Sequence, residues 1–336
     1  MPVAAGEHGF RHVPRASCAG WPMIERTRIV DVSQWPEEEQ DPDEPLGARG
    51  STWLVEPGDD PSGAGLLWIF KPVRQRTVVH EDQRPWFEED WAEYVATRVG
   101  ELLDLPVAGI ELAVRHARRG VISPSFVPDR AMPPTFGNEL LFRDDPGYPL
   151  DAKGEVAGYQ VGRCLELLRD YGPPDGAAAA FTSASDAFAG YLLLDALVAN
   201  TDRHHENWSV LQHHGRSHLS PCYDLGTCLG FQLTDPQRRD RLQTKDGNRT
   251  VRAWCEAGRS RTFEGRPRPL DVALQAFEWA SEPARSLLGE RLGQLEDAHL
   301  HRIVELVPPD RMSRWAGMFA VEALRINRDR LLERLA

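Results

Sequence analysis

Cysteine is scarce in this sequence, and long hydrophobic runs are missing. The 336 residues include five cysteines and no C-x-x-C pair, so the pattern predicts neither a disulfide scaffold nor a zinc cluster. The longest apolar run, Ala187–Ala199, is shorter than a bilayer span and contains Asp195. The first twenty residues lack the apolar core of a signal peptide. We therefore expect a cytoplasmic protein with reduced thiols and no membrane span.

An excess of positive charge is also absent. The chain has 51 acidic and 39 basic residues and a formal net charge of −12, which argues against general binding to nucleic acid. Hydrophobic residues make up 41% and charged residues 27%, which is the composition of an ordinary globular protein. The length allows one large domain or two lobes that share a core.

Strand and helix patterns divide the chain into two lobes after a flexible N-terminal segment at residues 1–23. Residues 24–128 are predicted to form a small α+β lobe with one helix over 86–103. Its predicted strands cover 24–35, 47–55, 66–72, 110–115 and 120–127. Residues 129–336 are predicted to be mostly helical. The predicted helices of this second lobe cover 155–170, 183–198, 272–280, 284–306 with a break, and 318–335.

A polar loop at residues 200–207 is the most informative segment. An apolar helix precedes the sequence NTDRHHEN, and another apolar run follows it, which is typical of a catalytic loop on a rigid scaffold. Asp202 and Asn207 are five residues apart, so a loop can turn both toward one point. Asp224 stands between an aromatic and an aliphatic residue, where an acid is costly unless it is paired or binds a cation. Two aspartates and an asparagine provide the oxygen ligands that magnesium prefers.

The other groups that phosphoryl transfer needs precede this loop. Lys71 ends an apolar strand, and a glycine turn at residues 47–50 opens the strand before it. Glu89 and Glu93 share one face of the predicted helix, one turn apart. Kinases use a lysine on the phosphates, a helix glutamate that steadies it, a residue that positions the hydroxyl, and Asn and Asp as metal ligands. The pattern leaves open which glutamate pairs with Lys71.

The segments NTDRHHEN and YDLG resemble the catalytic and metal-binding motifs of HipA-like serine/threonine kinases. The turn Gly47-Ala48-Arg49 and the helix segment Ala92-Glu93-Tyr94 also match, and the resemblance covers about residues 45 to 230. It implies a bilobal protein-kinase-like fold of the α+β class, with a small β-rich N-lobe and a larger helical C-lobe. It also implies ATP and magnesium as cofactors and a Ser/Thr hydroxyl of a protein as acceptor. A toxin role, with an antitoxin or another regulatory protein as partner, is a further implication.

The same resemblance implies a role for each site residue. Asp202 would be the catalytic aspartate, and Lys71 would reach the phosphates with Glu93 as its partner. Asn207 and Asp224 would hold magnesium. The residues that would surround the nucleotide are Gly47, Ala48, Arg49, Gly50 and Ser51 of the phosphate-covering loop, and Ser125, Phe126 and Val127 of the hinge.

The histidines and buried cysteines give separate expectations. We place His204 with the catalytic residues and expect it to brace the loop through a hydrogen bond. His205 is expected to be exposed, as are the three histidines of a predicted hairpin turn, His213, His214 and His218. Cys222 and Cys228 are expected to be small core residues.

Two alternative functions stay open at this point. The loop NTDRHHENW is also similar to that of type II phosphatidylinositol 4-kinases, which would make the acceptor a lipid or another small molecule. A nucleotide-binding pseudokinase is the third hypothesis, and the complete Lys, Asp, Asn, Asp set disfavours it. The basic run at residues 238–252 could surround a phosphate, receive an acidic partner or face an anionic headgroup. It lacks an amphipathic membrane-anchoring pattern, so we favour a soluble substrate.

Overall fold

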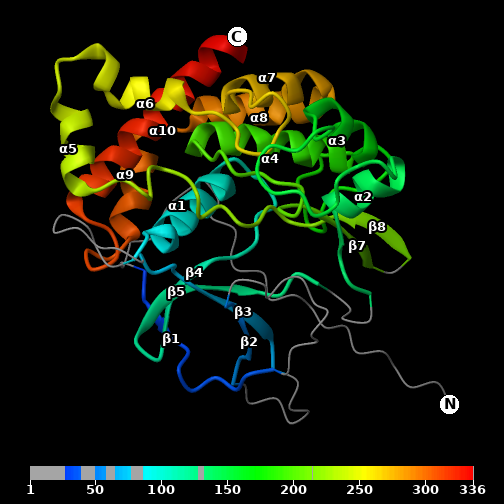
Figure 1. Cartoon of the computed structure of the whole chain (residues 1–336), viewed down its shortest axis with the longest axis horizontal. Helices are drawn as coiled ribbons and strands as arrows, with labels where there is room; N and C mark the ends of the chain where they lie inside the picture. The colour runs from blue at the N-terminus through cyan, green and yellow to red at the C-terminus, as the bar shows by residue number, and fades with distance from the viewer. Residues whose placement is uncertain are drawn as a thin grey trace.

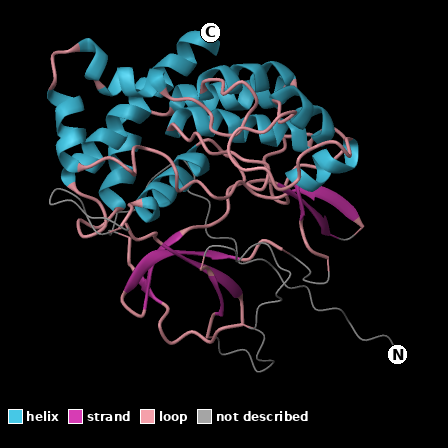
Figure 2. Cartoon of the chain, viewed as in Figure 1, coloured by secondary structure: helices cyan, strands magenta, loops and turns pink. Residues whose placement is uncertain are grey.

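The computed structural model describes residues 27–38, 50–57, 65–76, 86–127, 132–213 and 215–335. Figures 1 and 2 show one sheet at one end of the molecule and the helices at the other, with a small second sheet beside the helices. This arrangement confirms the expected fold class, a β-sheet lobe joined to a helical lobe. The segment 1–23, the turn at 47–49, and residue 128 at the expected lobe boundary lie outside the described residues.

A five-stranded sheet forms the smaller lobe. Its strands follow the order β1-β4-β5-β3-β2, and every neighbouring pair is antiparallel except β1 and β4. The strands are β1 (Val30–Asp31), β2 (Thr52–Val55), β3 (Leu67–Pro72), β4 (Glu111–Arg115) and β5 (Arg118–Pro124). Lys71 of β3 pairs with Val121 of β5. At the adjacent Gly120, a Cβ atom would lie 2.3 Å from the Lys71 carbonyl oxygen, so only glycine lets the two strands approach this closely.

Helix α1 (Glu89–Leu102) lies between the sheet and the helical lobe (Figure 1). Its apolar residues, among them Trp91 and Val95, belong to the main hydrophobic core. Its buried Asp90 accepts hydrogen bonds from Arg119 of β5 at 2.8 and 2.9 Å and from Arg311 at 3.0 Å. Because a buried carboxylate requires such partners, this triad fixes the rotation of α1 relative to the sheet.

The larger lobe packs its helices around α4 (Ala184–Val198), in which every residue is buried. The other helices are α2 (Gly137–Asp144), α3 (Val161–Leu168), α5 (Asp235–Gln243), α6 (Val251–Ala257), α7 (Pro269–Trp279), α8 (Glu282–Gln294), α9 (Asp297–Leu306) and α10 (Arg314–Leu335). A small antiparallel sheet of β6 (Thr135–Phe136), β7 (Ser209–His213) and β8 (Arg216–Leu219) completes the lobe.

Sequence patterns locate α4 and α10 well and miss three shorter helices. The helices α2, α5 and α6 have no counterpart among the expected segments. The helix expected over 155–170 begins only at Val161, because Gly158 within the expected span adopts a positive φ angle of 78°. In the described part of the chain, none of the helices is both long enough and apolar enough to cross a membrane.

Candidate active site

A cavity of about 430 Å³ lies between the two lobes, and we call it the interlobe cavity. Apolar side chains from the sheet lobe line one part of it, including Ile69 and Ile110. Polar groups line another part, including Lys71, Asn207 and Asp224. The volume falls within the range of about 300–1,000 Å³ that small-molecule sites occupy, and the mix of apolar walls with a few polar groups is typical of them.

Lys71 brings the two lobes together at this cavity. Its amino nitrogen lies 2.8 Å from Glu93 Oε1 on α1 and 2.8 Å from Asp224 Oδ1 in the loop after β8. Along the chain, Glu93 lies 22 residues after Lys71, and Asp224 lies 153 residues after it. The structure therefore joins the predicted phosphate-binding lysine, helix glutamate and metal-binding aspartate in one network.

The choice between the two helix glutamates is settled by their contacts. Glu93 is buried and bonds Lys71, whereas Glu89 forms an ion pair with the more exposed Arg74. Glu89 also accepts a hydrogen bond from the Arg74 backbone N–H at 3.2 Å. One helical turn thus separates a glutamate that reaches the cavity from one that ties α1 to the segment after β3.

Electrostatics keep Lys71 charged. Burial would lower the pKa of its amino group, but the nearby carboxylates of Asp224 and Glu93 outweigh this effect and raise the pKa. Burial raises the pKa of the Glu93 carboxyl, and the attraction to Lys71 opposes that rise. The lysine therefore carries its positive charge throughout the physiological pH range.

Asp224 occupies an unusual backbone position. Its φ angle is 58°, in the left-handed region that aspartate tolerates better than most residues. The preceding Tyr223 anchors the segment, because its hydroxyl donates to the Glu206 carbonyl at 2.8 Å and its ring stacks on Phe126 with centroids 5.3 Å apart. Such backbone strain is commonly concentrated at functional sites.

The loop 200–207 follows Ala199, which caps α4 and whose φ angle of 55° turns the chain out of the helix. The Asn207 side-chain nitrogen donates to the Asp202 carbonyl at 2.8 Å, which leaves the amide oxygen as the atom that can meet a ligand. His204 Nδ1 accepts from the Glu206 backbone N–H at 3.2 Å, and His204 and Asn207 both line the interlobe cavity. Asp202 is partly exposed and is not among the lining residues.

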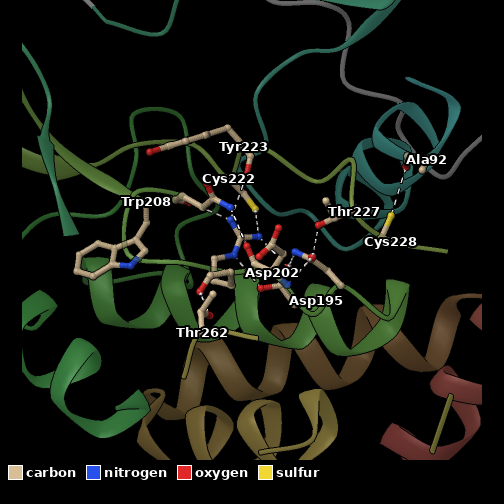
Figure 3. Close-up of polar contacts among 12 residues, drawn as sticks. Ala92, Asp195, Asp202, Trp208, Cys222, Tyr223, Thr227, Cys228 and Thr262 are labelled. Carbon is tan, nitrogen blue, oxygen red and sulfur yellow. Dashed lines mark hydrogen bonds and ion pairs between the residues drawn. The ribbon is translucent and has the colours of Figure 1, made fainter. Parts of the chain in front are cut away.

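A buried arginine beneath the loop is the main feature that the sequence analysis missed. Arg203 donates two hydrogen bonds of 2.8 Å to Asp195 of α4. Its guanidinium also donates to the carbonyls of Asn207 at 2.9 Å and Tyr223 at 3.1 Å. Figure 3 shows Asp195, Cys222 and Tyr223 converging on this point. One side chain thus holds the Asn207 loop against the segment that carries Asp224.

The expectation that His205 is exposed is wrong. His205 is 2% exposed, and its Nδ1 lies 2.7 Å from the Tyr148 hydroxyl. Burial lowers the pKa of His205 to about 4, so the ring is neutral at physiological pH. The expectation that the hairpin histidines are exposed is also wrong for His218, which is buried. It is wrong as well for His213, which is half-buried with its Nδ1 3.0 Å from Asp175 Oδ2. His214 lies outside the described residues.

The expected hinge follows β5 at the edge of the interlobe cavity. Ser125, Phe126 and Val127 all line the cavity. The Ser125 N–H donates to the Leu67 carbonyl at 2.8 Å, and the Val127 N–H donates to the Ser125 hydroxyl at 3.3 Å. Two of the three hinge N–H groups therefore already have partners within the protein.

The expected phosphate-covering loop lies only partly within the described residues. Ser51 lines the interlobe cavity, and Gly50 adopts a positive φ angle of 77°. Gly47, Ala48 and Arg49 lie outside the described residues. The positive φ at Gly50 fits a turn that leads into β2.

Cys222 and Cys228 are buried, as expected. Burial raises the pKa of both thiols, which keeps them protonated. The Cys228 thiol donates to the Ala92 carbonyl of α1 at 3.5 Å, and Figure 3 shows this contact. These cysteines pack the segment around Asp224 against its neighbours.

Comparison with known proteins assigns the family. A model of the HipA-like C-terminal domain matches residues 47–278. The chain belongs to this family. No curated protein sequence matches the chain.

Comparison with solved structures of other proteins identifies the fold. The kinase CtkA of Helicobacter pylori is similar over 92% of this chain and 96% of its own, with a TM-score of 0.68 and 16% sequence identity. HipA of Shewanella oneidensis MR-1, solved with HipB and operator DNA, aligns over 90% of this chain and 67% of its own, with a TM-score of 0.41 and 15% identity. The likeness to CtkA shows that this HipA-like chain has a kinase fold.

Proposed function

We propose that this protein is a kinase that uses ATP and magnesium to phosphorylate a Ser/Thr hydroxyl of another protein. The observation that carries the proposal is the contact of Lys71 with both Glu93 and Asp224 at 2.8 Å, at the edge of a cavity that Asn207 also lines. These residue types in this arrangement match the requirements of phosphoryl transfer. Lys71 is also one of only three lysines in the chain, among 39 basic residues.

The residues present fit a nucleotide with magnesium. Carboxylate and amide oxygens are the ligands that magnesium prefers, so Asp224 and Asn207 would hold the metal. Lys71 would hold the phosphates, and the apolar wall near Ile69 and Ile110 would receive the base. Bound magnesium supplies charge neutralisation on the phosphates.

The chain's own groups perform the remaining tasks. Asp202 accepts a hydrogen bond from the attacking hydroxyl and takes its proton. Asn207 keeps the Asp202 backbone in place through its 2.8 Å hydrogen bond, and His204 braces the same loop through Glu206. Glu93 positions the Lys71 amino group. The toxin role and an antitoxin or other regulatory partner stay predictions of the family resemblance.

Thermal unfolding with and without Mg-ATP tests nucleotide binding. A ligand that binds only the folded state raises its stability by about 2.7 kcal/mol at a hundred times its dissociation constant. We expect Lys71→Ala to weaken ATP binding roughly tenfold to a hundredfold, since a hydrogen bond between charged groups contributes about 1.5–3 kcal/mol. Lys245→Ala is the matched control, because Lys245 is exposed and lies outside the interlobe cavity. Equal Mg-ATP stabilisation of both variants would contradict the proposal.

The acceptor is tested separately. The protein is incubated with Mg-ATP and either a cell lysate or phosphatidylinositol vesicles, and the products are analysed by mass spectrometry. We expect phosphorylated Ser/Thr peptides with the unmodified protein and none with Asp224→Ala. Phosphorylated lipid alone would instead support the lipid-kinase hypothesis, and ATP binding without any product would support the pseudokinase hypothesis.

A further inference from the structure

A second cavity, of about 350 Å³, opens in the helical lobe beside the catalytic loop. Parts of α4, α6, α7 and α10 surround it, and Figure 1 shows α6 and α10 next to each other. Every charged side chain among its described lining residues is an arginine. These arginines, which define the arginine pocket, are Arg259, Arg261, Arg266, Arg268 and Arg330. Such a concentration of positive charge is unexpected in a chain with a net charge of −12.

The five arginines differ in their contacts. Arg259 donates to the carbonyls that end α6, at 2.9 to 3.3 Å, and Arg330 donates to Asn327 at 3.0 Å. Arg261 and Arg268 are exposed, and their guanidinium groups make no hydrogen bond or ion pair with any of the described residues. Clustered guanidinium groups without a carboxylate beside them repel one another, and an anion relieves that repulsion.

The basic run at residues 238–252, where the sequence suggested an anion site, is different. Arg238 is buried against Glu88 at 2.5 Å and also contacts Asp235. Arg249 pairs with Asp240 at 2.7 Å. These two arginines already have carboxylate partners, whereas Arg261 and Arg268 in the segment 259–268 have none among the described residues.

The arginine pocket is built on the catalytic loop. Thr201 lines it, and the Arg261 backbone N–H donates to the Thr201 carbonyl at 2.8 Å. Asp202 follows directly, and neighbouring Cα atoms are about 3.8 Å apart. The Thr262 hydroxyl donates to the Arg203 carbonyl at 3.0 Å, and Figure 3 shows Thr262 beside this loop. A group bound in the pocket is therefore held close to the residue that would position the acceptor hydroxyl.

The segment that carries these arginines is rigidly folded. Ser260 Oγ accepts from the backbone N–H groups of Thr262 and Phe263 at 3.2 and 3.1 Å. The Phe263 ring stacks on Tyr159 with centroids 4.3 Å apart. Arg266 closes the turn with a φ angle of 46° and donates its N–H to the Phe263 carbonyl at 3.0 Å. Such a fixed backbone lowers the entropy cost of presenting the side chains to a ligand.

We propose that the arginine pocket binds a carboxylate or phosphate side chain of the acceptor protein, within a few residues of the hydroxyl that receives the phosphate. This inference rests on the kinase function proposed above and specifies its substrate class as an acidic segment. Arginine recognises carboxylate and phosphate through paired N–H donors. Apolar walls from Phe231, Trp254 and Leu270 would contact the rest of the segment.

The test is a binding measurement that requires no turnover. Fluorescein-labelled peptides with one serine flanked by glutamates, or by glutamines, are titrated with the full-length protein, and fluorescence anisotropy is recorded. We expect the glutamate peptide to bind more tightly. In the double variant Arg261→Glu/Arg268→Glu its affinity should fall about tenfold or more, because charge-assisted hydrogen bonds are lost and like charges are introduced.

A matched control separates local contacts from overall charge. The double variant Arg143→Glu/Arg239→Glu changes the net charge equally, at exposed positions that line neither cavity. We expect its peptide affinity to stay within about twofold of the unmodified protein. An equal loss in both double variants would overturn the proposal, and so would equal binding of the two peptides by the unmodified protein.

Two further arms identify other occupants. If inorganic phosphate stabilises the unmodified protein but not Arg261→Glu/Arg268→Glu, while the glutamate peptide fails to bind, the pocket is a small-anion site and the proposal is wrong. Stronger binding of an RNA oligonucleotide than of the glutamate peptide, lost in the same variant, would also overturn it. Failure of the kinase function is distinguishable, since it leaves arginine-dependent peptide binding without any phosphate transfer.

Discussion

Alternate residues of one loop have opposite environments. From Asp202 to Asn207, the even-numbered residues are partly exposed and the odd-numbered residues are buried. The partly exposed set contains Asp202, which would position the acceptor hydroxyl, and His204, which braces the loop. The buried set contains Arg203 and His205, whose side chains have partners inside the protein, and Asn207, which also lines the interlobe cavity. The loop therefore both presents groups for the proposed reaction and anchors itself in the core. Substitutions at neighbouring residues should for this reason have unrelated effects.

The comparison is sharpest between Asp202 and Arg203. Asp202→Asn should reduce turnover by about 10²- to 10⁴-fold, because positioning and proton acceptance contribute that much. ATP affinity and the free energy of unfolding should stay nearly unchanged, since Asp202 is partly exposed and does not line the interlobe cavity. Phosphotransfer rates, ATP titration and urea denaturation measure the three quantities. Turnover at the unmodified rate would contradict the assigned role.

Arg203 should show the opposite pattern. Arg203→Met leaves the buried Asp195 carboxylate without its main partner, which should lower the free energy of unfolding by about 3–5 kcal/mol. The double variant Arg203→Met/Asp195→Leu should recover part of this loss, because it removes the unpaired charge. Arg143→Met, at an exposed position, is the control and should change stability by no more than about 0.5 kcal/mol. Equal stability of Arg203→Met and the control would refute the structural role.

Sequence reasoning located the loop because its polar residue types and spacing are local properties. The two lobes, α4, and Lys71 at the end of β3 followed from apolar periodicity, which is also local. The burial of His205 could not be read in this way, because a single sequence does not show which residues of an irregular loop meet the core. Arg203 had a detectable signal in Asp195, a lone acid within an apolar helix that requires a buried cation.

Ion pairs engage part of the basic run at residues 238–252, where the sequence suggested an anion site. In this run, Arg238 pairs with Glu88, 150 residues away, and such a pair cannot be read from a single sequence. Arg249 pairs with Asp240, which lies within the run itself. The arginine pocket forms because folding brings Arg330 of α10 to the arginines of the segment 259–268, with no acidic residue among the described lining residues. Charge counts show neither the ion pairs nor the arginine pocket. The scarcity of lysine, in contrast, is visible in the sequence and is a signal that points to Lys71.

The smallest expected effect is the contribution of His205 to the pH dependence of stability. Its pKa is about 4 in the folded protein and about 6.5 when unfolded, so the unfolded chain takes up the proton first as pH falls. Stability should therefore decline between about pH 6.5 and pH 4, by about 2 kcal/mol at pH 5. In urea denaturation, His205→Gln should show a flatter pH dependence over this window, whereas His301→Gln, at an exposed position on α9, should keep the original slope. If the stability of both variants changes with pH at the same rate, the His205 ring does not titrate as a buried group. The contrast between buried and partly exposed residues of the loop then fails at this position.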